Sequence, residues 1–338
     1  MIIRNCYKEE IPQLIEFLKE YWNPNHILVK HPEILLWQYQ DDNGGLNFLI
    51  AKEKDEINSE ILAILGYIPL SHFDKHLSSN KECWGAIWKV SPKCQIPGLG
   101  TFMQKKICNL YDFYGGLSLS NDSIRIQQSL SKSILRVNQY FIINPSIKDF
   151  NIACIPNDFV PQKNNQNGNC QLREIYDISS CNINHAYSPT KSIEFIVNRY
   201  EKHPWYKYSF LACYINNIIN CILVLRKINV KDRVAIRIVD VYGDLSNITG
   251  LGFQLEQYLL SQPKTEYIDL CNYGIGQYFF LKNGFNILDV NSDKIIIPNY
   301  FEPFERKNIP IVAVTHTKTN KNYIYFKGDA DQDRPNIL

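Results

Sequence analysis

The spacing of hydrophobic residues predicts alternating helices and strands in the first half of the chain. Between residues 9 and 22 the apolar positions recur every three or four residues, the period of an amphipathic helix, and Pro24 is expected to block further helix. In residues 83–90 every second position is apolar, the period of a strand. The expected series is a strand at 2–4, a helix at 9–22, strands at 48–52, 61–68 and 83–90, a helix at 101–111, a strand at 117–120 and a helix at 123–137.

The second half of the chain repeats this order after a polar segment. Residues 162–169 contain nothing that a core could bury, so they are interpreted as a linker between two domains. The expected elements after the linker are a strand at 172–176, a helix at 192–200, strands at 210–215, 218–225 and 234–241, a helix at 253–260, a strand at 267–270 and a helix at 275–281.

Two glycine-containing loops occupy corresponding places in these series. Gln95 to Gly100 and Asn247 to Gly252 each follow a strand, precede a helix and end in Gly-Leu-Gly. Because the loops and their neighbouring elements share one order, duplication of a single domain explains them better than chance. We therefore expect an N-terminal domain at 1–161 and a C-terminal domain at 170–338.

Composition and charge exclude several classes of protein. The 338 residues are 45% hydrophobic and 21% charged, an ordinary globular balance, and a net charge of +2 gives no support for nucleic-acid binding. The N-terminus lacks the pattern of a secretory signal, and no apolar run approaches the ~18 residues that span a bilayer. A cytoplasmic protein that binds neither nucleic acid nor membranes is expected.

The ten cysteines predict neither a metal site nor a redox motif. They are scattered, and no C-x-x-C pair occurs. In a reducing compartment such residues behave as small core side chains. We therefore expect free thiols and no bound metal.

The first glycine loop has the features of an anion site. A strand that opens through glycines into a helix presents backbone N–H groups and the positive end of the helix dipole to a pyrophosphate. Glycine allows the anion to approach closely and tolerates positive φ. A plain strand-to-helix turn accounts for the same pattern about equally well.

The sequence Gln95-Ile96-Pro97-Gly98-Leu99-Gly100 resembles the Q/R-x-x-G-x-G/A loop of the GNAT superfamily of acyl-CoA-dependent N-acyltransferases. The segment from Tyr278 to Phe285 is similar to the helix and Gly-Phe turn that closes a GNAT domain. The resemblance implies an α/β fold with a mixed (α+β) sheet, present as two tandem GNAT-like domains. Such tandem chains, and the ending Lys327 to Pro335, resemble N-acyltransferases that modify nucleotide-linked amino sugars.

Two departures from the family pattern place the cofactor in the first domain. Asn247 stands where the family has Gln or Arg, and Phe280 stands where many members carry a general-acid Tyr, while Tyr278 would face elsewhere on the helix. The resemblance then implies that acyl-CoA, as co-substrate, contacts residues of the first domain: Trp88, Val90, Gln95, Ile96, Pro97, Gly98, Leu99, Gly100 and Thr101.

The implied reaction needs little from side chains. An amine attacks the thioester carbonyl, whose oxygen the family polarises with backbone N–H groups of the central strand, here near Trp88 to Val90. Asn121 and Asp122 follow the next expected strand and are the candidate catalytic residues. Because Ser, Asn and Asp favour helix N-caps, a capping role is favoured for Asp122 about two to one.

Two charged residues are candidates for the acceptor site. Asp240 lies within an apolar strand, where a carboxylate needs a partner, so it either binds a sugar hydroxyl or amine or forms an ion pair with another element. Arg334 could grip a pyrophosphate with its planar guanidinium, although a solvated C-terminal tail is the commoner outcome.

An aromatic segment of the second domain offers a further acceptor contact. Trp205 and Tyr206 could stack on a nucleotide base, and packing within the protein is the somewhat favoured alternative. The C-terminal domain is therefore expected to contribute to the acceptor site.

Three functions fit this sequence. The first is transfer of an acyl group from acyl-CoA to the amine of a nucleotide-linked amino sugar. The second is an aminoacyl transferase of the peptidoglycan-branching type, for which the expected basic surface and long helical insertion are not visible. The third is a non-catalytic GNAT pair that serves as a binding module, which Phe280 favours and the intact first loop disfavours.

Overall fold

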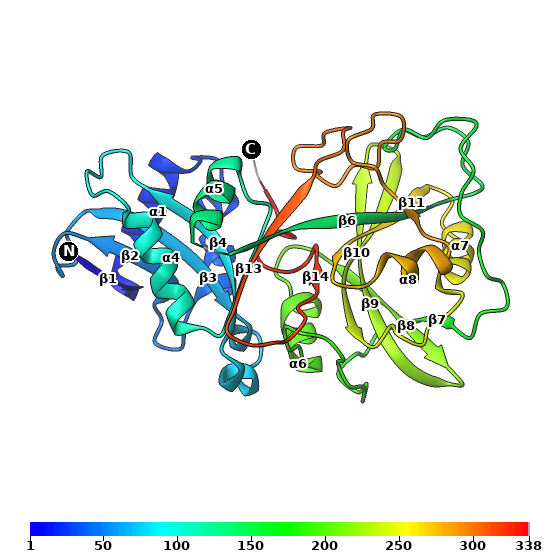
Figure 1. The fold of residues 1–338 in the computed structure, drawn as a ribbon, viewed down its shortest axis with the longest axis horizontal. Coiled ribbons are helices and arrows are strands. Elements are labelled where there is room, and N and C mark those ends of the chain that lie inside the picture. The colour runs from blue at the N-terminus through cyan, green and yellow to red at the C-terminus, as the bar shows by residue number, and fades with distance from the viewer. Residues whose placement is uncertain (131, 337–338) are drawn as a thin grey trace. The chain divides into compact units, whose positions relative to one another are not determined.

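The computed structural model describes residues 1–130 and 132–336. Two compact units are present, and each combines separate segments of the chain: unit 1 comprises Met1–Leu135, Val312–Asn320 and Ala330–Leu338, and unit 2 comprises Arg136–Ile311 and Lys321–Asp329 (Figure 1). The units thus differ from the expected continuous domains 1–161 and 170–338. The difference arises because the strand at 133–143 pairs with the sheet of the second half, whereas the strand at 311–317 pairs with the sheet of the first.

Unit 1 is built on a mixed sheet. The order of its strands is β1-β2-β3-β4-β5-β13, with β4 and β5 parallel and the other neighbouring pairs antiparallel. The strands are β1 (Ile2–Cys6), β2 (Leu46–Lys52), β3 (Ile61–Pro69), β4 (Glu82–Val90), β5 (Phe113–Leu117) and β13 (Ile311–Thr317).

Helix α4 covers one face of this sheet. Leu99, Met103 and Ile107 lie on one side of α4, at helical spacing, and pack on side chains of β2 and β3 such as Leu49 and Leu65. The helices of unit 1 are α1 (Ile11–Tyr21), α2 (Ile27–Lys30), α3 (Pro32–Tyr39), α4 (Leu99–Leu110) and α5 (Asn121–Ser129), with 3₁₀ turns η1 (Lys8–Glu10), η2 (Leu70–His72) and η3 (Lys75–Asn80).

One sequence prediction in unit 1 is confirmed and one is wrong. Helix α1 ends at Tyr21, before Pro24, as predicted, and the separate helix α3 begins at Pro32, where the missing N–H and fixed φ of proline suit the first turn. The helix expected at 123–137 ends at Ser129, and strand β6 already begins at Ser133. Serine favours helix ends, and the β-branched and aromatic residues that follow suit a strand.

Unit 2 repeats the mixed sheet. Its order is β6-β11-β10-β9-β8-β7, β10 and β11 are parallel, β12 pairs with β6 and β14 pairs with β11. The strands are β6 (Ser133–Ile143), β7 (Gln171–Ile175), β8 (Tyr208–Ile215), β9 (Ile218–Val230), β10 (Arg233–Gly243), β11 (Thr265–Tyr273), β12 (Asn286–Ile287) and β14 (Tyr325–Phe326).

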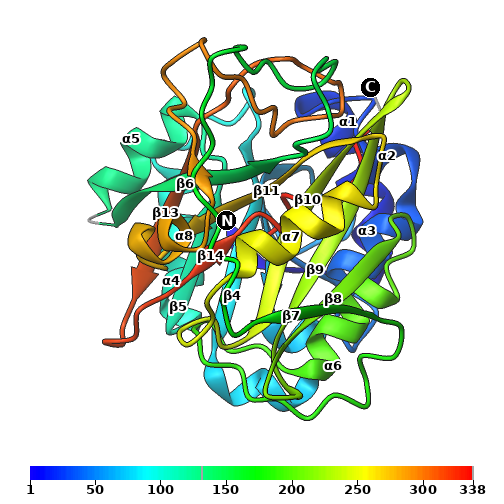
Figure 2. The ribbon, with the colours of Figure 1, turned by 90° about the vertical axis from the view of Figure 1, so that its right-hand side faces the viewer.

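Helix α7 lies across one face of the unit 2 sheet (Figure 2). Ile236 and Ile238 of β10 pack in the cluster with α7, whereas Ala235, the residue before Ile236, packs in the cluster on the opposite face. The helical elements of unit 2 are α6 (Ile193–Ile196), the π-helical turn η4 (Val197–Glu201), α7 (Leu251–Leu260) and α8 (Gln277–Lys282).

The two sheets share one order of strands. Strands β1 to β5 of unit 1 correspond in order and direction to β7 to β11 of unit 2, and the glycine loops precede α4 and α7. The sixth position of each sheet is filled by a strand distant in sequence, β13 in unit 1 and β6 in unit 2. The two sheets therefore have the same strand order and directions, and duplication of one domain stays a prediction.

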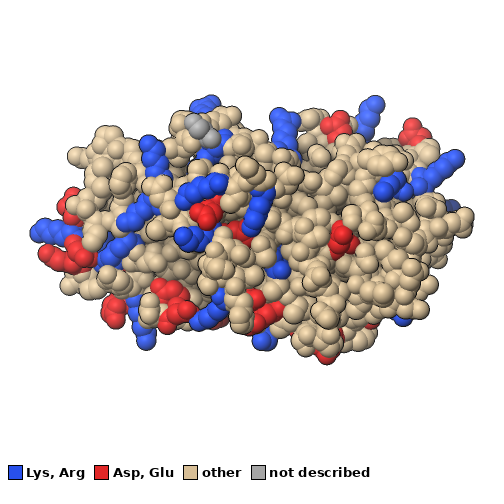
Figure 3. Space-filling view, turned by 60° about the horizontal axis from the view of Figure 1, so that its bottom comes forward, with Lys and Arg blue, Asp and Glu red and all other residues tan. Residues whose placement is uncertain are grey.

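The surface charges and the helix lengths can be compared with the sequence predictions on nucleic-acid and membrane binding. Basic and acidic side chains are interspersed on the face shown in Figure 3. Among the helices of the described residues, none has the length and apolarity needed to cross a lipid bilayer. All ten cysteines are free thiols, as predicted.

Candidate functional site

The first glycine loop leads directly into α4. Residues Gln95 to Gly98 are exposed, while Leu99 and Gly100 are buried at the first turn of the helix. Gly98 is the N-cap and has a φ of +74°, a left-handed conformation that side chains disfavour. The first N–H groups of α4 have no acceptor within the helix, so the helix directs its donors and its positive dipole toward this loop.

The two glycines of this loop have different surroundings. A Cβ atom at Gly98 would meet nothing within 4 Å, so the outer side of the loop is open. A Cβ at Gly100 would lie 2.9 Å from the Trp88 ring and 3.1 Å from Val90, so this glycine lets α4 start close to β4. The buried Trp88 Nε1 has no hydrogen-bond partner among the described residues. The predicted cofactor residues Trp88, Val90, Gly98 and Gly100 therefore lie together.

Strands β4 and β5 are paired only at their beginnings. The parallel pairing ends at Trp84 on β4 and Gly115 on β5, although β4 continues to Val90. A register shift in the pairing with β3, between Leu65 and Tyr67, places a bulge in the same part of β4. The C-terminal half of β4 therefore pairs with β3 alone in the described residues, and it leads into the glycine loop.

Protein atoms fill the second glycine loop. Gly250 caps α7 with a φ of +79°, but a Cβ there would lie 2.7 Å from Gly168 Cα. The Asn169 side chain accepts a hydrogen bond from Thr249 N at 2.9 Å and donates one to Asn247 O at 2.8 Å. The segment predicted to be a linker thus covers this loop.

A second asparagine closes the start of α7. Asn283 Oδ1 accepts a hydrogen bond from Leu251 N at 3.1 Å, and a Cβ at Gly252 would lie 1.9 Å from Asn283 O. An N–H group at the start of a helix that an anion would need is therefore already bonded. Asn283 and Asn169 thus both occupy the start of α7 and the loop before it.

The candidate catalytic residues begin a helix. Ser120 is the N-cap of α5, and its Oγ accepts a hydrogen bond from Ser123 N at 3.3 Å. Asn121 and Asp122 are the first two residues of α5, and both are exposed. Ser120 therefore fills the capping role weighed for Asp122. A carboxylate in the first turn stabilises the helix dipole, and a catalytic role for either residue stays a prediction.

Phe280 belongs to the core of unit 2. Its ring is 1% exposed and stacks on Tyr140 with 4.0 Å between centroids, whereas Tyr278 is 76% exposed. The position where family members carry a general acid is thus a packed aromatic contact. Position 280 itself carries no hydroxyl.

Asp240 lies in a buried ionic cluster of unit 2. It is fully buried, and Lys191 Nζ lies 2.7 and 2.8 Å from its two carboxylate oxygens. Tyr200 donates its hydroxyl to Asp240 Oδ2 at 2.7 Å, and Lys191 also pairs with Asp329 at 2.9 Å. Of the two predicted roles, the ion pair with other elements is therefore the one that the geometry favours.

The cluster shifts the pKa values of its members. Burial raises the pKa of Asp329 to about 6, although the neighbouring Lys191 acts in the opposite direction. Burial alone would lower the pKa of Lys191, but the carboxylates of Asp240 and Asp329 outweigh it and raise that pKa. The sequence contained no signal for these partners, because they come from separate elements far apart along the chain.

Arg334 is held within unit 1 rather than solvated. Its guanidinium lies 3.2 Å from Asp331 Oδ2 and donates to Asn336 Oδ1 at 2.9 Å. Arg334 Nη1 lies 2.6 Å from His26 Nε2, and since a guanidinium can only donate, this imidazole nitrogen must accept. Burial, together with Arg334, lowers the pKa of His26 to about 3. The prediction that the C-terminal tail around Arg334 is solvated is therefore wrong.

Acidification is expected to destabilise the protein through His26. The folded-state pKa is lowered below the unfolded value of about 6.5, so the unfolded chain binds the proton first and stability falls as the pH drops from about 6.5 to 3. Between pH 7 and pH 5 this residue alone should remove about 2 kcal/mol of unfolding free energy. Urea unfolding at both pH values measures the loss. His26→Gln should show a smaller pH dependence, and an equal one would contradict the assignment.

The aromatic candidates of unit 2 differ in exposure. Trp205 is 42% exposed. Tyr206 instead contacts charged side chains: its hydroxyl donates a hydrogen bond to Glu302 Oε1 at 2.5 Å, and the Arg226 guanidinium lies 4.1 Å from its ring centroid. The His203 ring stacks on Tyr206 from another side. The packing alternative fits Tyr206, while the Trp205 ring presents apolar surface to solvent.

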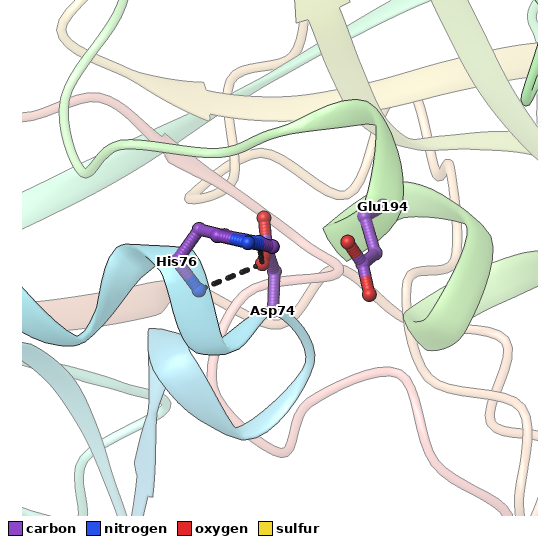
Figure 4. Close-up of side chains that lie close together, drawn as sticks. All are labelled: Asp74, His76 and Glu194. Carbon is purple, nitrogen blue, oxygen red and sulfur yellow. Dashed lines mark hydrogen bonds and ion pairs between the residues drawn. The ribbon is translucent and has the colours of Figure 1, made fainter.

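A carboxylate–histidine contact caps the 3₁₀ turn η3. Asp74 accepts a hydrogen bond from the His76 backbone at 2.9 Å, and His76 Nδ1 lies 3.0 Å from the same oxygen (Figure 4). Glu194, drawn in the same view, is the first-turn acidic residue of α6 in unit 2. Asp74 therefore has a structural role as N-cap of η3.

Solved structures share this fold. A GCN5-related N-acetyltransferase from Anabaena variabilis matches 93% of the chain over 72% of its own length, at 10% identity and a TM-score of 0.55. A conserved Enterococcus faecalis protein, described as a probable N-acyltransferase, matches 92% of the chain over 71% of its own, at 10% identity and a TM-score of 0.53. No family model and no curated protein matches the sequence. The predicted α/β fold with a mixed sheet, of the GNAT type, is thereby confirmed.

Proposed function

We propose that this chain is an acyl-CoA-dependent N-acyltransferase that binds its donor at the glycine loop of unit 1. The observation that carries the proposal is the contrast between the two loops. The loop at Gly98 is open on its outer side and begins a helix, whereas protein atoms fill the loop at Gly250. Backbone N–H groups at a helix start favour a diphosphate, which coenzyme A carries.

The C-terminal half of β4, which pairs with β3 but not with β5, is the proposed place for the thioester. A pantetheine arm beside Trp88 to Val90 would find backbone donors that the pairing with β5 no longer occupies. The amine nitrogen attacks the thioester carbonyl, the C–N bond forms and the C–S bond breaks. Asp122, exposed at the start of α5, is proposed to accept the proton that the nitrogen loses, directly or through water, and that proton is then passed to the thiolate, which departs as the thiol.

The proposed acyl acceptor is the amine of a nucleotide-linked amino sugar. Trp205 is the proposed stacking surface for the base, because its ring is exposed on unit 2. The buried position of Asp240 and the internal contacts of Arg334 and Tyr206 give these three residues structural roles. Their direct contact with an acceptor is not part of the proposal.

Donor binding and turnover test the proposal separately. Calorimetric titration with coenzyme A should show one site, and acetyl-CoA with a panel of nucleotide-linked amino sugars should release free thiol. Absence of coenzyme A binding would refute the donor site. Binding without turnover on any amine would favour the binding-module alternative, which the buried Phe280 also favours. Turnover only with aminoacyl-tRNA would favour the aminoacyl transferase.

A further inference from the structure

A cavity of about 360 Å³ opens in unit 1 at the C-terminal ends of α4 and α5, beside β13. Its volume lies within the range of small-molecule sites. The lining includes Lys105 and Asn109 of α4, Ser129 of α5, Lys132, and His316 of β13. No Asp or Glu occurs among the described residues that line it.

Lys132 is a buried cation without an anionic partner. The whole residue is 7% exposed, and no carboxylate pairs with it among the described residues. The ammonium donates to Gln104 Oε1 at 3.0 Å and lies 4.3 Å from the Tyr114 ring centroid, so its contacts are with neutral groups. Burial lowers the pKa of Lys132. A buried charge of this kind is costly unless a counter-ion reaches it.

The other ionisable side chains that line the cavity are also basic. Lys105 is exposed and carries a second ammonium, and His316 has its pKa lowered by burial and by the nearby Lys132 and Lys318. Lys318 itself lies 3.7 Å from Asp112, so that charge is partly compensated outside the lining. The lining therefore combines positive charge with the neutral side-chain amide of Asn109, a set that suits an oxyanion.

We propose that this cavity binds a small anionic molecule through a phosphate or carboxylate group held by Lys132, Lys105 and His316. The site is separate from the proposed donor loop, because Lys105 lies seven residues beyond Gly98, about 10 Å along the axis of α4. The proposal does not depend on the acyltransferase function. A bound anion would supply the counter-charge that Lys132 lacks within the protein.

Titration of the full chain with inorganic phosphate and with malonate tests the site. At ionic strength matched with sodium chloride, at least one probe should bind and raise the melting temperature, and the tighter probe identifies the preferred head group. Lys132→Met should weaken that binding about tenfold or more, because one charge-assisted contact is lost. Lys19→Met removes an equal charge from an exposed residue of α1 outside the cavity and should leave binding unchanged.

Three outcomes would refute the proposed anion site. In the first, neither phosphate nor malonate has a larger effect on the wild type than sodium chloride at the same ionic strength. In the second, a folded Lys132→Met variant binds the probe as tightly as the wild type, and in the third, coenzyme A displaces the probe completely. The last would make the cavity part of the donor site. If Lys132→Met does not fold, Lys105→Met replaces it and should weaken the probe several-fold. Failure of coenzyme A to bind would refute the proposed function and leave the phosphate and malonate titrations as an independent result.

Discussion

Replacing Lys191 with methionine is expected to remove about 3–5 kcal/mol of unfolding free energy, the usual cost of leaving a buried charge unpaired. The ammonium is 2.7 Å from Asp240 and 2.9 Å from Asp329, and all three residues are buried in unit 2. Without it, two carboxylates remain close together in a dry environment. Tyr200 and the backbone N–H of Val241 would still bond Asp240 but carry no positive charge. Urea unfolding at pH 7 measures the loss.

The pH dependence of the variant distinguishes this explanation from simple loss of packing. The pKa of Asp329 is already raised to about 6 in the presence of Lys191, and removal of the cation should raise it further. A carboxyl group with a raised folded-state pKa destabilises the fold as the pH rises through the window from about 4 to that pKa. The defect of Lys191→Met should therefore shrink at pH 5 and grow at pH 8.

Matched variants complete the test. Lys202→Met removes an exposed lysine of unit 2 whose ammonium donates a hydrogen bond to Asn198, and surface changes of this kind shift stability within about 0.5 kcal/mol. Lys191→Met combined with Asp329→Asn removes one of the two facing charges and should recover part of the loss. A loss below 1 kcal/mol, or one that is equal at pH 5 and pH 8, would show that the cluster is not held by charge.

The local patterns of apolar residues and glycines in the sequence predicted many of the helices and strands. The apolar spacing of α1 and α4, and the two loops that begin α4 and α7, were predictable because hydrophobic period and glycine placement act over a few residues. These local patterns did not predict that β13 would pair with β5 in unit 1 and β6 with β11 in unit 2. Which strand fills the sixth position of a sheet depends on contacts between residues far apart in sequence, and period alone does not encode partners.

The candidate site shows the same limit. The loop at Gly98 was predicted as a cofactor site from its own residues, and it is open on its outer side. The covering of the second loop by Asn169 and Asn283 had no local signal, because both residues act through contacts with distant backbone groups. Asp240 needed a partner on physical grounds, yet only the fold shows that Lys191 supplies it. Lys132 likewise carried no pattern that marked it as buried.

Replacing Gly98 with valine is expected to weaken coenzyme A binding at least tenfold, with a smaller effect on folding. The added side chain would project into the open space beside the loop, where the proposed diphosphate lies, and would block the backbone donors of α4. The φ of +74° adds strain of about 1–2 kcal/mol for a residue with a side chain. Calorimetric titration of the folded variant with coenzyme A gives the dissociation constant.

Two matched glycines separate strain from obstruction, since each has a similar positive φ. Gly44→Val, at a φ of +81° in unit 1, should lose comparable stability and keep its coenzyme A affinity. Gly250→Val should lose more stability, because its side chain would collide with Gly168, and should also keep that affinity. If Gly250→Val alone lost donor binding while Gly98→Val kept it, the donor would belong to unit 2. Only Gly98 borders the open side of the loop. Equal losses of coenzyme A affinity in Gly44→Val and Gly98→Val would therefore show that backbone strain, and not obstruction of the donor, causes the effect.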